Sequence, residues 1–207
     1  MAQEIDIVLA SESPRRKQLL EDAGVVFHAI PSEADETLTE EQRGDPEQAA
    51  QELAKRKAGF IVQQILAGEP PAKPTAVIGA DTMVVLDGRI FGKPHNVSEA
   101  KGMLRKLSGN THQVITGVSV WVVAPAADGK VSMGSKTFAD VSHVTFKQLD
   151  DARIEEYLRL GESFDKAGAY AIQGAGAQLI EGYEGDYDNI VGLPVVRLLR
   201  EFPDLAS

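Results

Sequence analysis

Residues 5–16 read IDIVLASESPRR. This stretch predicts the strand, turn and helix with which the fold begins. The apolar run 5–10 predicts a short buried strand. Ser13 is a typical N-cap and Pro14 a typical first helical residue, so we expect a helix from there to about Asp22. A strand that leads through a tight turn into a helix places the unpaired N–H groups of the helix start at the end of that strand.

This helix start carries an unusual charge. Arg15 and Arg16 are unfavourable beside the positive end of the helix dipole unless an anion is bound there. Guanidinium groups match phosphate oxygens, and Ser11 and Ser13 add hydroxyl groups. The turn therefore predicts a phosphate-binding site. An ordinary capped helix with solvated arginines would have the same residues, and at this point that alternative stays open.

The rest of the chain predicts a mixed α/β fold, because strands and helices alternate early and hairpins dominate the middle. We expect further strands at 25–30, 75–86, 89–91, 114–123, 136–146 and 178–180. We expect further helices at 46–67, 96–107, 151–160 and 191–202, a polar loop over 31–45 and a turn at Asp128-Gly129. No linker or repeat divides the chain, so residues 1–207 are treated as a single domain.

Composition excludes several classes of protein. The 207 residues contain no cysteine, so disulfides, zinc–thiolate sites and a thiol nucleophile are excluded. No apolar stretch approaches the roughly 18 residues of a membrane span, and we expect neither a membrane nor a secreted location. The formal net charge of −10 disfavours nucleic acid as a partner. Local clusters of cations then indicate a small anionic ligand.

Two charged residues fall where apolar residues belong. Lys57 lies near the centre of the apolar stripe of the helix at 46–67. Asp81 interrupts the buried strand at 75–86. A buried charge is costly unless it meets an opposite charge, a metal ion or a reacting group. A lysine that extends to solvent and a carboxylate held by nearby backbone are the ordinary alternatives.

The remaining signals are weaker. Glu33 lies in the polar loop after the second expected strand, and Lys93 lies in the short loop 92–94. No P-loop pattern occurs, and the four histidines lack the spacing of metal ligands. Carboxylates and cations remain, a set that suits a hard divalent cation bridging carboxylate and phosphate oxygens.

Taken in order, these segments resemble the Maf family of nucleoside triphosphate pyrophosphatases. Each motif is weak alone, but the ordered series spans nearly the whole chain. The motifs are SESPRR (11–16), Glu33, LA (53–54), KA (57–58), GADT (79–82), GKP (92–94), HQVITG (112–117), DKAGAYAIQG (165–174) and VGLP (191–194).

The resemblance implies a mixed elongated sheet with flanking helices and two lobes around a central cleft, similar to inosine triphosphate pyrophosphatases. It implies hydrolysis between the α- and β-phosphates of a nucleoside triphosphate, which gives the nucleoside monophosphate and diphosphate. It also implies a divalent metal ion, Mg²⁺ or Mn²⁺, a cytoplasmic location and often a homodimer.

By position, the resemblance also implies roles for single residues. Asp81 would be the proton acceptor that activates water, and Glu33 with Asp81 would hold the metal ion. Lys57 and Lys93 would complete the catalytic set. The implied substrate contacts are Ser11, Ser13, Arg15, Arg16, Thr82, Asp165, Lys166 and Gln173, of which Arg15, Thr82 and Gln173 would set base preference.

The segment 165–174 resembles the branch of the family that acts on dTTP and UTP, and modified pyrimidine nucleotides also fit. The Gln173 amide offers a donor and an acceptor together, as a pyrimidine edge requires. Two alternatives stay open. One is a pyrophosphatase for 7-methyl-GTP or inosine triphosphate, and the other is a non-catalytic nucleotide-binding regulator of cell division.

Overall fold

The computed structural model describes residues 5–126 and 130–206. The strands are β1 (Asp6–Leu9), β2 (His28–Ala29), β3 (Thr75–Leu86), β4 (Arg89–Phe91), β5 (Thr111–Pro125), β6 (Val131–Phe146) and β7 (Ile180–Glu184). The α-helices are α1 (Pro14–Asp22), α2 (Glu40–Arg43), α3 (Pro46–Ala67), α4 (Val97–Leu107), α5 (Asp151–Arg159), α6 (Tyr187–Val191) and α7 (Val195–Glu201). The 3-10 helices are η1 (Ala167–Ala169), η2 (Gly174–Leu179) and η3 (Pro203–Ala206).

The strands form one mixed sheet in the order β2-β1-β3-β5-β6-β7, with β4 paired to β3 at the side. β1 runs parallel to both of its neighbours, and the remaining pairs are antiparallel. This confirms the predicted mixed α/β class. Among the described residues, no helix is both long and apolar enough to cross a bilayer.

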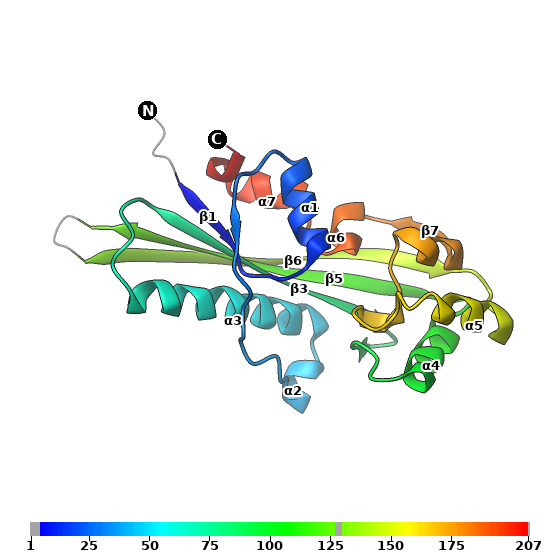
Figure 1. The fold of residues 1–207 in the computed structure, drawn as a ribbon. Helices are drawn as coiled ribbons and strands as arrows, with labels where there is room; N and C mark the ends of the chain where they lie inside the picture. Colours follow the sequence, from blue (N-terminus) through cyan, green and yellow to red (C-terminus); the bar gives the residue numbers. More distant parts are fainter. Residues whose placement is uncertain (1–4, 127–129, 207) are drawn as a thin grey trace.

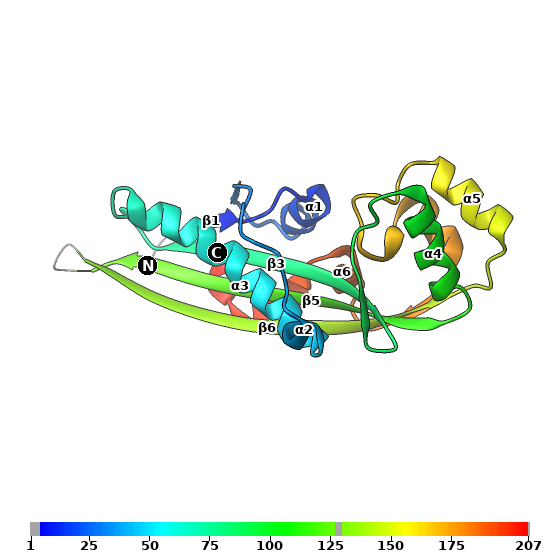
Figure 2. The same ribbon diagram turned by 90° about the horizontal axis from the view of Figure 1, so that it is seen from below.

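The molecule is elongated along β5 and β6, as Figure 1 shows. α3 follows one side of the long strands, while α1 and α7 lie on the other side. Figure 2, seen from the α3 side, shows α4 and α5 gathered at one end of the molecule, away from α1. The sheet thus carries separate helical layers, and segments far apart in sequence meet near its middle.

Three predicted elements differ from the structure. The second strand is only two residues long, His28–Ala29. The expected loop over 31–45 contains α2, because Thr39 and Gln42 form a reciprocal capping box. The expected helix over 191–202 is present only as α7 (Val195–Glu201), and a separate short helix that was not expected, α6 (Tyr187–Val191), ends just before Gly192, whose φ of 134° is a conformation that favours glycine.

A further predicted strand is shifted toward the C-terminus. The strand expected at 178–180 begins at Ile180 and continues to Glu184, because residues up to Leu179 belong to η2. The turn expected at Asp128-Gly129 lies outside the described residues. The other helices and strands are confirmed to within a few residues at their ends, the largest differences being the earlier start of β6 and the longer β5.

Glycines let α3 lie directly on the sheet. A Cβ atom at Gly79 of β3 would lie 2.2 Å from the carbonyl oxygen of Ala54, and one at Gly117 of β5 would lie 2.2 Å from that of Ala50. Both alanines are fully buried. Gly117 pairs with Asp81 across the ladder, so this close contact holds the helix beside that carboxylate.

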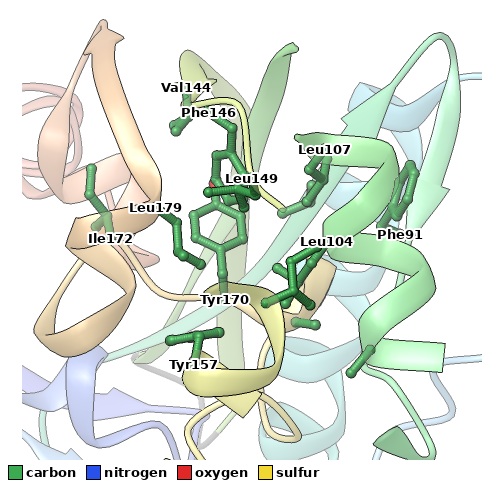
Figure 3. Close-up of a cluster of buried hydrophobic side chains, with 14 of the residues drawn as sticks. Phe91, Leu104, Leu107, Val144, Phe146, Leu149, Tyr157, Tyr170, Ile172 and Leu179 are labelled. Carbon is green, nitrogen blue, oxygen red and sulfur yellow. The ribbon is translucent and has the colours of Figure 1, made fainter. Parts of the chain in front are cut away.

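A separate hydrophobic cluster anchors the segment 165–174. Figure 3 shows Tyr170 inside this cluster, beside Leu104 of α4 and below Phe146. The Tyr170 hydroxyl lies 2.6 Å from Nε2 of His112. Burial lowers the pKa of His112 to about 4, so this ring is neutral at physiological pH. The segment is therefore fixed at its middle by an aromatic anchor.

The close approach of α3 to the sheet predicts a large cost for one added methyl group. We expect Gly117→Ala to destabilise the fold by about 1–3 kcal/mol or more, because the methyl group would overlap the backbone of α3. Gly59→Ala on α3 is the matched control. Nothing lies within 4 Å of its added Cβ, so we expect a gain of up to about 1 kcal/mol from helix propensity. Urea denaturation measures both, and equal stabilities would contradict the packing described here.

Candidate active site

A cavity of about 710 Å³ opens where the start of α1 and the middle of β3 meet the segment 165–174. Of the twelve site residues predicted from the sequence, all but Glu33 line this cavity. The eleven are Ser11, Ser13, Arg15, Arg16, Lys57, Asp81, Thr82, Lys93, Asp165, Lys166 and Gln173. The fold therefore gathers residues from five separate motifs around one space.

The two charges predicted at apolar positions form an ion pair. Nζ of Lys57 lies 2.6 Å from Oδ1 of Asp81, and each side chain is only 12% exposed. The ammonium is therefore paired inside the cavity rather than extended to bulk solvent. Removing the ammonium would leave the Asp81 carboxylate buried without its ion-pair partner.

A second carboxylate, which the sequence analysis missed, shares this lysine. Oε1 of Glu36 lies 3.0 Å from Nζ of Lys57, and Glu36 lines the cavity. Glu33 is exposed and lies outside the cavity lining, so the structure does not bring it to Asp81 as the predicted metal pair requires. Both glutamates belong to one acidic loop without periodicity, and no pattern in that loop distinguishes them.

The donor set limits the kind of metal site that fits. No group of three or more His, Cys, Asp or Glu able to hold a metal ion occurs within residues 5–126 and 130–206. Mg²⁺ is commonly held by one or two carboxylates and completes its shell with water and substrate phosphate oxygens. Asp81 and Glu36, which meet at Lys57, fit such a metal ion shared with a phosphate ligand and do not fit a cage made of protein alone.

The start of α1 holds Arg16 firmly. The Oγ atom of Ser13 accepts from the Arg16 backbone N–H at 3.4 Å, which confirms the predicted N-cap. The Arg16 guanidinium donates to the Gly192 carbonyl at 2.8 Å and to Thr82 at 3.0 Å. Burial lowers the pKa of Arg16, although Asp81 opposes that shift, and the group remains a cation. For Arg16, the alternative of a solvated side chain is wrong.

Across the cavity, the segment 165–174 supplies a second group of charges. Nη1 of Arg15 lies 3.4 Å from the Asp165 carboxylate, which also accepts from Lys166 at 2.6 Å. Burial disfavours the charged form of Asp165, but the two cations outweigh it and its pKa lies below the ordinary value. The Gly168 backbone N–H donates to the carbonyl of Gly92 at 3.1 Å, which ties this segment to the loop that carries Lys93.

The arrangement as a whole combines a group of cations that can bind an anion with the buried carboxylate of Asp81. Cationic side chains from the α1 start, α3, the loop 92–94 and the segment 165–174 line one space together with the start of α1, a combination suited to several phosphate groups. Asp81 provides a carboxylate on the lining of that space, where it can accept a proton. Gln173 is exposed on the cavity lining, where its amide can meet a ligand.

Comparison with known proteins agrees with these features. Residues 6–205 match the family described as Maf-like protein. A dTTP/UTP pyrophosphatase of Clostridioides difficile is 46% identical over 94% of this chain and 92% of its own length. One of Bacillus velezensis is 45% identical over 94% of this chain and 93% of its own length.

Among solved structures, a nucleoside-triphosphatase (dITP/XTP pyrophosphatase) of Mycobacterium abscessus aligns with 97% of this chain and 95% of its own. Its TM-score of 0.39 and identity of 13% are too low to carry an argument. The family match and the curated relatives span almost the whole chain, including the motifs that line the cavity. The chain therefore belongs to the Maf-like protein family.

Proposed function

We propose that this chain is a pyrophosphatase that hydrolyses the bond between the α- and β-phosphates of dTTP and UTP. The products are the nucleoside monophosphate and diphosphate. The buried Lys57–Asp81 pair, which faces the cationic start of α1, is the observation that carries the proposal. The curated relatives at 42–46% identity that are named dTTP/UTP pyrophosphatase support the choice of substrate.

In this proposal the cationic side of the cavity binds the triphosphate. Arg15, Arg16 and Lys93 are the cations that meet the phosphate oxygens, together with the N–H groups of the α1 start. The Arg16 guanidinium is already in place before the ligand binds, because it is held by Gly192 and Thr82. Fixed positive charge stabilises the negative charge that develops on the leaving diphosphate without further reorganisation.

Asp81 is the proposed proton acceptor. Lys57 donates to its Oδ1 at 2.6 Å, so Oδ2 is the oxygen available to take a proton from the attacking water. We propose Asp81 and Glu36 as the residues that would hold Mg²⁺ or Mn²⁺, in place of the predicted pair with Glu33. When bound, such an ion supplies positive charge to the phosphate oxygens.

Base preference is proposed to depend on Gln173. Its exposed amide lines the cavity on the segment anchored by Tyr170, and it can pair with the donor and acceptor of a pyrimidine edge. A cytoplasmic location, a homodimer and a house-cleaning role toward modified pyrimidine nucleotides remain part of the proposal as predictions from the family resemblance.

A panel of nucleoside triphosphates tests the proposed substrate. With Mg²⁺ present, we expect pyrophosphate release from dTTP and UTP to exceed release from ITP, ATP and 7-methyl-GTP by about tenfold or more, since hydrogen-bonded pockets reject unmatched edges. Highest activity on a purine nucleotide would contradict the pyrimidine preference. Tight binding without release of pyrophosphate from any triphosphate would favour the non-catalytic regulator.

The role of Asp81 predicts a specific loss of turnover. Asp81→Asn keeps the shape of the side chain and an oxygen for Lys57, so we expect a folded protein whose kcat falls by about 10²–10⁴-fold. Asp87→Asn, an exposed change in the turn after β3, is the matched control and should retain full activity. Near-normal kcat in Asp81→Asn, measured as pyrophosphate release from dTTP, would rule out its role as the base.

The two glutamates of the acidic loop provide a further comparison. We expect Glu36→Gln to lower turnover by about tenfold or more, because it removes a carboxylate beside Lys57. We expect Glu33→Gln to leave turnover within about twofold, since Glu33 lies outside the cavity lining. Steady-state kinetics at several Mg²⁺ concentrations measures both variants, and the reverse order of effects would restore the assignment made from the sequence.

A further inference from the structure

We infer that a hydrogen-bond relay from Arg16 through Thr82 and Thr116 to Asn189 sets the position of the Arg16 guanidinium in the cavity. Thr116 and Asn189 are then positioning residues for phosphate binding, although neither lines the cavity. The inference rests on the proposed function for the nature of the ligand, a polyphosphate. The relay itself is described by contacts within the chain.

The direction of each bond in the relay follows from the available protons. Oγ1 of Thr116 donates to the backbone carbonyl of Asn189 at 2.9 Å, which uses its single proton. Thr82, whose Oγ1 lies 2.9 Å from that of Thr116, is therefore the donor to it, in preference to the Gly192 carbonyl at 3.5 Å. Oγ1 of Thr82 in turn accepts from Nη2 of Arg16 at 3.0 Å. The relay thus runs from the cation to a buried carbonyl.

At the end of the relay away from Arg16, Asn189 is held by several hydrogen bonds. Asn189 is fully buried, and its Nδ2 donates to the Val114 carbonyl at 3.0 Å and to Oγ of Ser142 at 2.9 Å. Ser142 donates its own proton to the carbonyl of Asp186 at 2.9 Å, so it can only accept from the amide. These bonds fix the orientation of the amide and pin α6 to β5 and β6.

The segment that follows Asn189 makes a second contact with the Arg16 guanidinium. α6 leads into Gly192, whose carbonyl accepts from Nε of Arg16 at 2.8 Å. Nη1 also donates to Ser11 at 3.4 Å. Counting acceptors in the described part of the chain, three of the five guanidinium N–H groups are engaged. The remaining two can meet phosphate oxygens, from a group whose plane is already set.

The relay engages the hydroxyl group of Thr82, which the sequence analysis had assigned to base preference. Thr82 lines the cavity, but its hydroxyl already accepts from Arg16 and donates to Thr116. Its proton is therefore committed within the protein rather than free for a nucleotide base. The influence of this position on the ligand runs through the placement of Arg16.

Thr116→Val tests the relay because it removes the hydroxyl and keeps the side-chain shape. We expect the affinity for inorganic triphosphate, measured by calorimetry, to fall about tenfold, and KM for dTTP to rise more than kcat falls. Thr116→Ser retains the hydroxyl and should restore affinity to within about twofold. Ser119→Ala is the matched control: it is equally buried in β5, it loses a hydroxyl bond to Thr137, and it should bind like the wild type.

A double-mutant cycle shows whether Thr116 acts through Arg16. Arg16→Lys keeps a cation, so binding stays measurable, but it lacks the forked group that contacts Thr82. In that background we expect Thr116→Val to change the affinity for inorganic triphosphate by less than about twofold. The full loss in both backgrounds, or no loss in either, would overturn the relay. If Thr116→Val does not fold, Thr82→Val breaks the relay at a half-buried position and enters the same cycle.

The two proposals fail in different ways. A wild-type chain that binds inorganic triphosphate but cleaves no nucleotide would refute the proposed activity, and the cycle would still report on the relay. Additive losses in the cycle would refute the relay whichever nucleotides are cleaved. A wild-type chain that does not bind inorganic triphosphate would overturn the relay's part in phosphate binding as well.

Discussion

The buried ion pair between Lys57 and Asp81 depends on how closely α3 lies on the sheet. Gly79 and Gly117 remove the side chains that would hold the helix away, and this brings the ammonium to 2.6 Å from the carboxylate. A buried pair of this kind is weak as a source of stability, since apolar residues of similar volume often serve as well. Its presence on the lining of a cavity is therefore better explained by chemistry than by stability. Glu36 joins the pair only because the acidic loop passes over the same lysine.

Other parts of the cavity are also held by contacts between distant segments. Arg16 of α1 donates to Gly192, which lies between α6 and α7, and to Thr82 of β3. Three parts of the chain must therefore fold before this cation is in position to bind an anion. Tyr170 plays a comparable part for the segment that carries Gln173, because it is fixed in a separate core. The cavity thus has rigid supports and an exposed lining, an arrangement that lets binding groups be placed accurately. An overall charge of −10 does not prevent this, because the cations gather locally.

Much of the fold follows from local sequence patterns. The capped turn at 11–16, the helix at 46–67 and the strand at 75–86 are marked by caps, by a period of 3.6 and by a continuous apolar run. The same patterns make Lys57 and Asp81 stand out, because each interrupts an apolar position. Elements whose boundaries depend on a few residues were less predictable. The short helix α2 and the break at Gly192 depend on one capping box and one glycine conformation.

The sequence by itself determined most of the long helices and strands, where the site motifs lie and which two charges require a partner. Only the tertiary structure decided the partners: that Lys57 meets Asp81, that Glu36 rather than Glu33 reaches the cavity, and that Arg16 is held by residues far along the chain. The physical reason is that propensity and periodicity act over a few neighbouring residues. Hydrogen bonds and ion pairs between distant segments depend on how helices dock on the sheet, and an irregular loop carries no periodic signal of which side chain faces inward.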